Sequence, residues 1–240
     1  MDRPKIVAML PVRNETHRYL KLVLSHLTEY IDEIVILDDA STDETPEICR
    51  SFSKVTRFKS LDESLFWRDE AALRNLLWEM TIELDPDWIL ALDADEIFES
   101  TIKKELSRLT QQNQYDLVYF PVYHFWGCLT HYRVDGMWNP LYSKIGCLFR
   151  YHKNIDYHWP MRKLHCGRFP LEVCKKPATL SSINLLHLGY AQKNEHYSKY
   201  RQYLSADPEG KYCPITHYQS IVHNKYQLKR WLGEKINVGV

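Results

Sequence analysis

The feature that most constrains the fold is an uncharged run that ends abruptly in acids. Residues 88–92 read Trp-Ile-Leu-Ala-Leu, and they are followed by Asp93, Asp95 and Glu96. A short apolar run of this kind is typical of a strand that is buried on both faces of a sheet. In open α/β sheets, ligands bind at the carboxyl ends of the strands. We therefore expect a buried strand here, with a polar site where it ends.

Asp93 and Asp95 are two residues apart, so in an extended segment both side chains would point to the same side. Two carboxylates in this arrangement suit Mg²⁺ or Mn²⁺, which bind carboxylate and phosphate oxygens together. The alternative is a solvated turn, because Asp-x-Asp also occurs by chance in many chains. The position at the end of a buried strand favours the metal.

Strand-like and helix-like segments alternate along the first 95 residues. Apolar runs predict strands, and apolar residues at helical spacing predict helices between them. The expected strands are residues 6–10, 34–37, 55–58 and 88–92, and the expected helices are 19–30, 45–52 and 66–84. This alternation is typical of an α/β fold with a largely parallel sheet.

The second half has a different texture. We expect a helix and a strand first, then an irregular aromatic-rich region at 124–180, then a strand and two helices. The regular segments are expected at 102–109, 115–123, 148–150, 178–180, 183–190, 195–204 and 216–232. The predicted organisation is one domain over residues 1–190, with halves 1–97 and 98–190, and a helical tail over 191–240.

Composition excludes several classes of protein. Among 240 residues, 31 are Lys or Arg and 31 are Asp or Glu, and this balance argues against a dedicated nucleic-acid binder. No apolar stretch approaches the ~20 residues that span a bilayer, and the first apolar run is too short for a signal peptide. Six scattered cysteines without a Cys-x-x-Cys pair indicate reduced thiols, so we predict a cytoplasmic protein.

Three segments carry a family resemblance when they are taken in order. They are residues 11–15 (Pro-Val-Arg-Asn-Glu), 38–45 (Asp-Asp-Ala-Ser-Thr-Asp-Glu-Thr) and 92–95 (Leu-Asp-Ala-Asp). Together they resemble the family 2 glycosyltransferases of the GT-A fold, and residues 148–150, 164–167 and 186–190 are similar to segments of bacterial members. The resemblance implies a central, mostly parallel sheet flanked by helices, with a C-terminal helical extension.

The resemblance also implies a nucleotide-diphospho-sugar donor, whose nucleotide is UDP, GDP or dTDP. The donor would be held by residues of the three segments and by one helix residue, namely Pro11, Arg13, Glu15, Asp38, Asp39, Arg74 and Asp93. Asp38 and Asp39 have an alternative role, because acids are favoured in helix-capping turns. The alternative for Arg74 is an ordinary salt bridge on a helix.

The resemblance implies Asp95 as the direct ligand of Mn²⁺ or Mg²⁺. A late histidine completes the metal shell in several GT-A enzymes, and His187 stands in the matching segment. Imidazole is an acceptable third ligand for Mn²⁺. The alternative for His187 is an ordinary packed histidine.

The catalytic base is where the chain departs from the family. Inverting members use a carboxylate to deprotonate the acceptor hydroxyl. At the position of the family's His-Glu pair, this chain has His165 and Cys166. The candidates for the base are Asp156 and His165, since the pKa of free histidine lies near neutrality.

The sequence therefore predicts a metal-dependent, inverting glycosyltransferase with a glycan, lipid-linked or small-molecule hydroxyl acceptor. The alternative is a non-catalytic nucleotide-sugar-binding scaffold or partner subunit. A nucleotidyltransferase is discounted, because residues 11–15 contain no glycine for a phosphate loop. Basic residues of the tail either bring the protein to the inner face of an anionic membrane or form a solvated helix face. They are Lys193, Lys199, Arg201, Lys225, Lys229 and Arg230.

Overall fold

The computed structural model describes residues 3–237. Strands and helices alternate through its first half, as the apolar pattern predicts. In chain order the elements of this half are β1 (Ile6–Val12), α1 (Leu20–Leu27), β2 (Glu33–Asp38), α2 (Thr45–Arg50), β3 (Val55–Ser60), α3 (Phe66–Ile82), β4 (Trp88–Ala91), β5 (Glu96–Phe98) and α4 (Ile102–Thr110).

The second half begins with the long strand β6 and ends with two helices and a short strand. Its elements are β6 (Leu117–Trp126), β7 (His131–Arg133), β8 (Lys144–Arg150), β9 (Ala178–Leu180), β10 (Leu185–Tyr190), α5 (His196–Ala206), α6 (Ile215–Val222) and β11 (Leu228–Arg230). Three short 3-10 turns lie between them, at Gly136–Trp138, Val173–Lys175 and Lys193–Glu195.

The described strands form one mixed sheet in the order β11-β7-β6-β8-β4-β1-β2-β3. Strands β4, β1, β2 and β3 run parallel, while β8 lies antiparallel between β4 and β6. Off this path, β10 pairs with β5 and β6, and β9 pairs with β6. The carboxyl ends of the parallel strands therefore meet at one edge, where the acidic segments lie.

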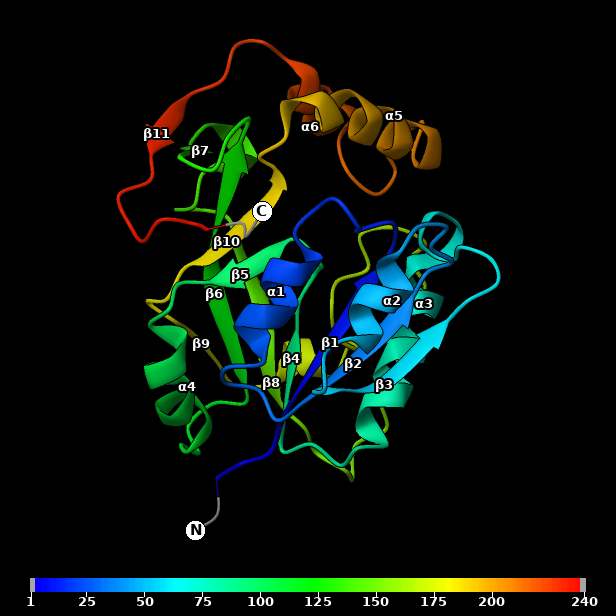
Figure 1. Cartoon of the computed structure of the whole chain (residues 1–240), viewed down its shortest axis with the longest axis vertical. Coiled ribbons are helices and arrows are strands. Elements are labelled where there is room, and N and C mark those ends of the chain that lie inside the picture. Colours follow the sequence, from blue (N-terminus) through cyan, green and yellow to red (C-terminus); the bar gives the residue numbers. More distant parts are fainter. Residues whose placement is uncertain (1–2, 238–240) are drawn as a thin grey trace.

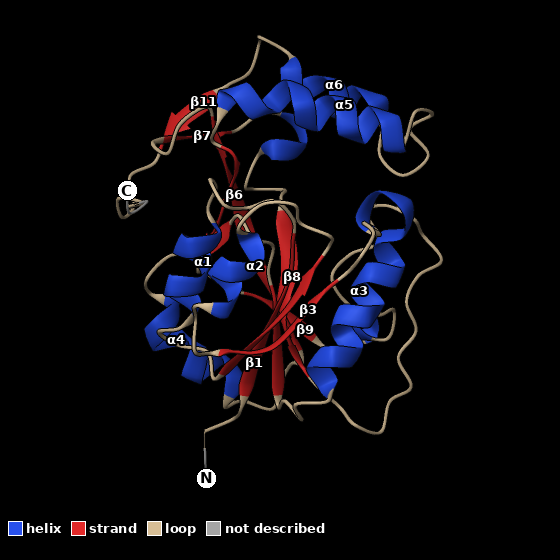
Figure 2. Ribbon diagram, turned by 45° about the vertical axis from the view of Figure 1, so that its right-hand side comes forward, coloured by secondary structure: helices blue, strands red, loops and turns tan. Residues whose placement is uncertain are grey.

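Alternation along the strands gives the sheet two buried faces. In β1, Ala8 and Leu10 pack with α1, α2 and α4, whereas Val7 and Met9 pack with α3. Figure 2 shows α1 and α4 on one face of the sheet and α3 on the other. Strand β4 is buried along its whole length, which confirms the prediction made from its uncharged sequence.

The sequence prediction fails in two places in the second half. The region 124–180 is less irregular than expected: the strand expected at 148–150 begins already at Lys144, and as β8 it occupies a central place in the sheet. The expected helix over 216–232 ends at Val222, and β11 follows, antiparallel to β7. Leu228 and Leu232 are exposed, so the helical spacing that suggested a longer helix marks no buried face. Pairing with the edge strand β7 satisfies this backbone instead.

Helices α5 and α6 lie across the end of the sheet that is opposite the N-terminus (Figure 1). They cover the carboxyl ends of the parallel strands from above. Within residues 3–237, no helix is long and apolar enough to cross a membrane.

Candidate active site

A cavity of about 640 Å³ lies between the carboxyl ends of β1, β2 and β4 and the inner side of α5. This volume is in the range that accommodates small molecules and cofactors. Its lining is dominated by charge. The cationic side chains are Arg13, Arg18, Arg74, Arg168 and Lys199, and the acidic ones are Glu15, Asp39, Glu70, Asp93, Asp95 and Glu195.

The first two motif segments interlock to form one wall of this cavity. Arg13 donates from Nη1 to the carbonyl oxygen of Asp39 over 2.6 Å. Asn14 accepts from the backbone N–H of Thr42 at 2.8 Å, and its own N–H donates to Ser41. Asn14 has φ of 53°, a left-handed conformation that asparagine tolerates better than most residues. The two loops therefore hold each other in place after β1 and β2.

Asp39 faces the cavity and also organises the start of α3. Its Oδ1 accepts from the N–H of Leu65 at 2.6 Å, and its Oδ2 accepts from the hydroxyl of Ser64 at 2.6 Å. Asp38 is buried and does not line the cavity; it accepts hydrogen bonds from the backbone and the hydroxyl of Ser41. This geometry supports the turn-stabilising role that was the alternative for Asp38.

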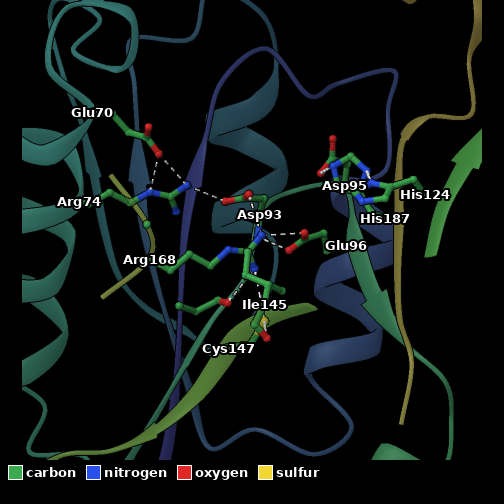
Figure 3. A network of polar contacts seen from close by, with 12 residues as sticks. Glu70, Arg74, Asp93, Asp95, Glu96, His124, Ile145, Cys147, Arg168 and His187 are labelled. Carbon is green, nitrogen blue, oxygen red and sulfur yellow. Dashed lines mark hydrogen bonds and ion pairs between the residues drawn. The ribbon is translucent and has the colours of Figure 1, made fainter. Parts of the chain in front are cut away.

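Asp93 is held by two buried guanidinium groups (Figure 3). Arg74 donates to its Oδ1 and Arg168 to its Oδ2, each over 3.0 Å. Burial opposes ionisation of this carboxyl, but Arg168 and Arg74 outweigh it and lower the pKa of Asp93. Asp93 is therefore a fixed negative charge.

Each of the two arginines also pairs with a second acid. Arg168 donates to Glu96 over 2.7 Å and to the carbonyl oxygen of Ala91 over 3.1 Å. Arg74 contacts Glu70, four residues earlier on α3, at 3.3 Å. Two arginines and three acids thus form a network in which every charge has a partner, as buried charges require.

Asp95 has looser surroundings, and Figure 3 shows it beside His187 and apart from the arginine network. His187, Lys199 and Arg18 each place a nitrogen 3.6 Å from one of its oxygens, which is too long for a hydrogen bond. Burial opposes ionisation, but His187, Lys199, Arg18 and Arg168 together hold the pKa of Asp95 well below its usual range. Its oxygens carry charge and remain free to bind a ligand.

Glu15 and Arg18 adjoin Asp95 and have polar atoms without partners. Arg18 contacts Glu15 Oε1 at 2.8 Å and Glu195 Oε2 at 3.2 Å, but Glu15 Oε2 and Arg18 Nε are buried with no hydrogen bond to any group in the described chain. Burial raises the pKa of Glu15 to about 8, because it outweighs the attraction of Arg18. Unsatisfied buried polar atoms at a cavity wall are typical of a place where a ligand supplies the partner.

His187 is brought to Asp95 by strand pairing. In the sheet it lies opposite Glu96 of β5 on one side and His124 of β6 on the other. Its Nδ1 is 3.3 Å from Nδ1 of His124, whose Nε2 is 3.0 Å from the hydroxyl of Ser143. If Nδ1 of His187 donates along this chain, its Nε2 presents a lone pair toward Asp95.

The two candidates for the base lie in very different places. His165 lines the cavity and has a left-handed backbone, with φ of 55°. Its N–H donates to Glu70 over 2.7 Å. Asp156 lies outside the cavity lining, and its side chain is 91% exposed beside His158.

Most of the predicted site residues converge on the cavity, which is lined by Pro11, Arg13, Glu15, Asp39, Arg74, Asp93, Asp95, His165 and His187. The sequence interpretation missed Arg18, Glu70, Arg168 and Lys199. Glu70 had a usable signal, since it stands one helical turn before Arg74. Lys199 was counted among the basic tail residues, but its Nζ lies 3.6 Å from Asp95, so it belongs to the cavity lining. Binding of the other basic tail residues to a membrane stays a prediction.

Fold and site together define the class: a mixed α/β protein of the GT-A type, with an acidic pair at the end of a central strand. The model of the family described as "Glycosyl transferase family 2" matches residues 8–166. The chain belongs to glycosyl transferase family 2.

Two relatives and one solved structure illustrate this membership. Uncharacterized protein Rv3786c of Mycobacterium tuberculosis is 25% identical over 222 residues, which cover 87% of this chain and 52% of the relative. Glycosyltransferase SunS of Bacillus phage SPbeta is 24% identical over 215 residues, covering 87% of this chain and 45% of SunS. The chain thus spans about half the length of the curated relatives it matches.

The structure of S. aureus TarS 1–349 in complex with UDP-GlcNAc superposes with a TM-score of 0.57 at 16% identity. The match covers 91% of this chain and 70% of that one. At this level of identity the likeness shows the fold alone, and with 91% of the chain covered it extends beyond the residues that the family model matches.

Proposed function

We propose that this chain binds a nucleotide-diphospho-sugar and transfers its sugar, with inversion, to a hydroxyl acceptor. The observation that carries the proposal is the cavity at the carboxyl ends of β1, β2 and β4. Five cationic and six acidic side chains line it, and Arg18 and Lys199 beside Asp95 make no hydrogen bond to that carboxylate, so a diphosphate can accept hydrogen bonds from them. A cavity this polar, built on parallel strand ends, suits a phosphorylated ligand better than an apolar one.

The donor would span the cavity from one motif segment to the next. Base and ribose would lie against Pro11, Arg13 and Asp39, where the two interlocked loops offer backbone and carboxylate groups. Asp93 would contact the ribose through whichever lone pairs its arginines leave free. The uridine nucleotide is our first choice, because TarS, which shares the fold, is solved with UDP-GlcNAc.

Asp95 and His187 fit a divalent metal as the third partner of the diphosphate. Their Oδ1 and Nε2 atoms are 3.6 Å apart, and one oxygen with one imidazole suits Mn²⁺ or Mg²⁺ that also takes phosphate oxygens. Among residues 3–237 no cluster of three or more such ligands exists, so phosphates and water would complete the shell. When bound, the metal offsets charge on the departing nucleoside diphosphate.

His165 is our candidate for the base. Both oxygens of nearby Glu70 are engaged by Arg74 and by the backbone of His165, and Asp156 lies outside the cavity. His165 would take the proton of the acceptor hydroxyl as its oxygen bonds to the anomeric carbon. The bond from that carbon to the diphosphate oxygen breaks, and its electron pair leaves with the nucleoside diphosphate.

The test is calorimetric titration with UDP, GDP and dTDP, with and without Mn²⁺, on the wild type and on Asp95→Asn. We expect one nucleotide to bind, with an affinity that rises with Mn²⁺ and loses that dependence in the variant. Release of UDP from UDP-GlcNAc in the presence of candidate acceptors then measures transfer.

Two outcomes would redirect the proposal. If no nucleotide binds in either metal condition, a nucleotide-sugar transferase is excluded. If a nucleotide binds with metal but no sugar is released to an acceptor or to water, the non-catalytic scaffold is favoured. Lys103→Gln is a suitable control, because this side chain pairs with Glu29 away from the cavity.

A further inference from the structure

A chain of hydrogen bonds leads from Asp207 through Tyr218 of α6 to the ring of His165. Asp207, just after α5, accepts backbone N–H groups from Lys211, Tyr212 and Cys213 over 2.7 to 3.0 Å. Its Oδ2 also lies 2.9 Å from the hydroxyl of Tyr218. Asp207 and Tyr218 are both buried.

The direction of each hydrogen bond follows from the chemistry of the groups. Burial opposes ionisation of Asp207, but the backbone donors and Tyr218 outweigh it and lower its pKa, so it is a carboxylate and accepts only. Tyr218 must therefore donate to Asp207. The hydroxyl has one hydrogen, so toward His165 it can only accept.

The ring of His165 is then fixed in one tautomer. Its Nε2 lies 2.9 Å from the Tyr218 oxygen and must be the donor. A neutral imidazole has a single N–H, so the proton-free nitrogen is Nδ1. Within residues 3–237, no group forms a hydrogen bond to Nδ1.

The position of the ring is fixed as well. It stacks on Tyr203 with centroids 5.6 Å apart and 19° between planes, and Tyr203 stacks on Tyr218 at 5.3 Å and 5°. At the backbone, the N–H of His165 is held by Glu70 in a left-handed conformation that costs energy for a non-glycine residue. His165 is thus anchored both at its backbone and at its Nε2 atom.

We propose that Asp207 and Tyr218 are positioning residues which hold His165 as the Nε2–H tautomer and leave Nδ1 free to accept the proton of the acceptor hydroxyl. This inference rests on the proposed function. The transferred proton stays on Nδ1, and the Nε2–H···O–H···carboxylate chain stabilises the imidazolium that forms.

The charged groups around His165 predict a pH signature. Burial lowers its pKa below the ordinary value; Glu70 on α3 and Asp207 raise it, while Arg162 lowers it further. His217 on α6 also faces it. The imidazole is therefore neutral at pH 7, and kcat should fall on the acid side as it becomes protonated.

The decisive variant is Tyr218→Phe, which removes one oxygen and keeps the stacked ring. We expect kcat to fall about 10²-fold, because the base loses its fixed orientation. The KM for the donor and the Kd for UDP should not change. The acid limb of kcat should move to lower pH, because the imidazolium loses an acceptor for its Nε2–H.

Tyr30→Phe is the matched control. Tyr30 is buried, and its hydroxyl lies 3.0 Å from Nδ1 of His26, away from the cavity. This variant removes a comparable tyrosine–histidine hydrogen bond and should leave kcat and its pH profile as in the wild type.

Long-range ¹H–¹⁵N NMR of the histidine-labelled full chain reads the tautomer without any turnover. We expect His165 to carry its proton on Nε2 in the wild type and to lose this single tautomer in Tyr218→Phe. An Nδ1–H tautomer in the wild type would overturn the inference even if the variant did not fold. So would equal kcat values for wild type and Tyr218→Phe. Absence of turnover in the wild type would instead overturn the proposed function.

Discussion

Asp93 and Asp95 are two residues apart, yet their surroundings differ in kind. Asp93 forms hydrogen bonds of 3.0 Å to two buried arginines, which have further protein partners. Asp95 has Arg18, Lys199 and the imidazole of His187 at 3.6 Å and no hydrogen bond to any of them. The protein therefore supplies hydrogen-bond donors to Asp93, whereas the oxygens of Asp95 are charged and remain free to bind a ligand.

The difference teaches how one short segment can serve two purposes. The Asp93 side, comprising Asp93, Glu96, Arg74 and Arg168, is part of what holds the loop after β4 in place. The Asp95 side, comprising Glu15, Arg18, Asp95, His187 and Lys199, keeps polar atoms without partners. Ligand-binding sites commonly keep polar atoms unpaired, and this lowers the stability of the folded protein.

Arg168→Met should have the largest effect on stability. It leaves Glu96, which is 2% exposed, without its closest cation, and Asp93 without one of its two. Breaking a buried pair in this way costs about 3–5 kcal/mol in the free energy of unfolding, measured by urea titration. Arg18→Met on the Asp95 side should cost less, because its side chain is 19% exposed and Asp95 keeps Lys199 beside it. Equal losses for the two variants would remove the distinction between the sides.

Asp95→Asn should separate activity from stability. We expect transfer to fall about 10²–10³-fold, the range seen when one preorganised electrostatic contact to a developing charge is lost. The free energy of unfolding should fall as well, because the cations that lower the pKa of Asp95 lose their charge partner, but by less than in Asp93→Asn, which also disturbs two hydrogen bonds of 3.0 Å. Nucleoside diphosphate release and urea titration give the two values. Asp93→Asn should be the less stable of the two variants, and the reverse order would contradict the comparison.

Gly189→Ala probes the space that the Asp95 carboxylate occupies. A Cβ at Gly189 would lie 2.3 Å from Asp95 Oδ2 and 2.8 Å from Lys199 Nζ, so one of them must move. We expect Mn²⁺ affinity to fall about 10- to 100-fold, as for other changes that displace a metal ligand indirectly. Gly146→Ala is the control, since its backbone is not left-handed and its Cβ would first meet the flexible side chain of Leu117, at 3.1 Å. Unchanged Mn²⁺ affinity in Gly189→Ala would argue against Asp95 as a ligand.

The pH dependence of stability should report on Glu15. Burial raises its folded-state pKa to about 8, so between the unfolded value near 4.3 and about 8 the folded state binds the extra proton. Stability should therefore fall as pH rises through this window, by at most about 1.4 kcal/mol per pH unit, and level off above it. The difference in urea stability between wild type and Glu15→Gln, measured from pH 5 to 9, isolates this contribution. The free energy of unfolding of the wild type minus that of Glu15→Gln should fall from pH 5 to pH 9, and a rise would contradict the prediction.

Local pattern explains why the first half could be predicted closely. The strands β1, β2 and β4 are buried on both faces, and short uncharged runs like theirs are typical of strands in a parallel sheet. Because parallel strands align their carboxyl ends, Asp39 and the Asp93–Asp95 turn had to approach one another. Family resemblance added the roles of these residues, which pattern alone could not supply.

The second half was harder because its contacts are made between distant segments. β8 enters the sheet between β4 and β6, and β11 completes an edge beside β7 where a helix was expected. Edge pairing depends on which backbone groups remain free once the fold has formed, and the sequence does not display that.

By itself, then, the sequence determined the α/β alternation, the interlocked segments after β1 and β2, and the acids after β4. Only the tertiary structure decided which cation each acid meets. Arg168 reaches Asp93 from 75 residues away, and Lys199 reaches Asp95 from α5. Charge pairing acts through space over a few ångströms, so residues with identical local sequence signals acquire different partners only when the chain has folded.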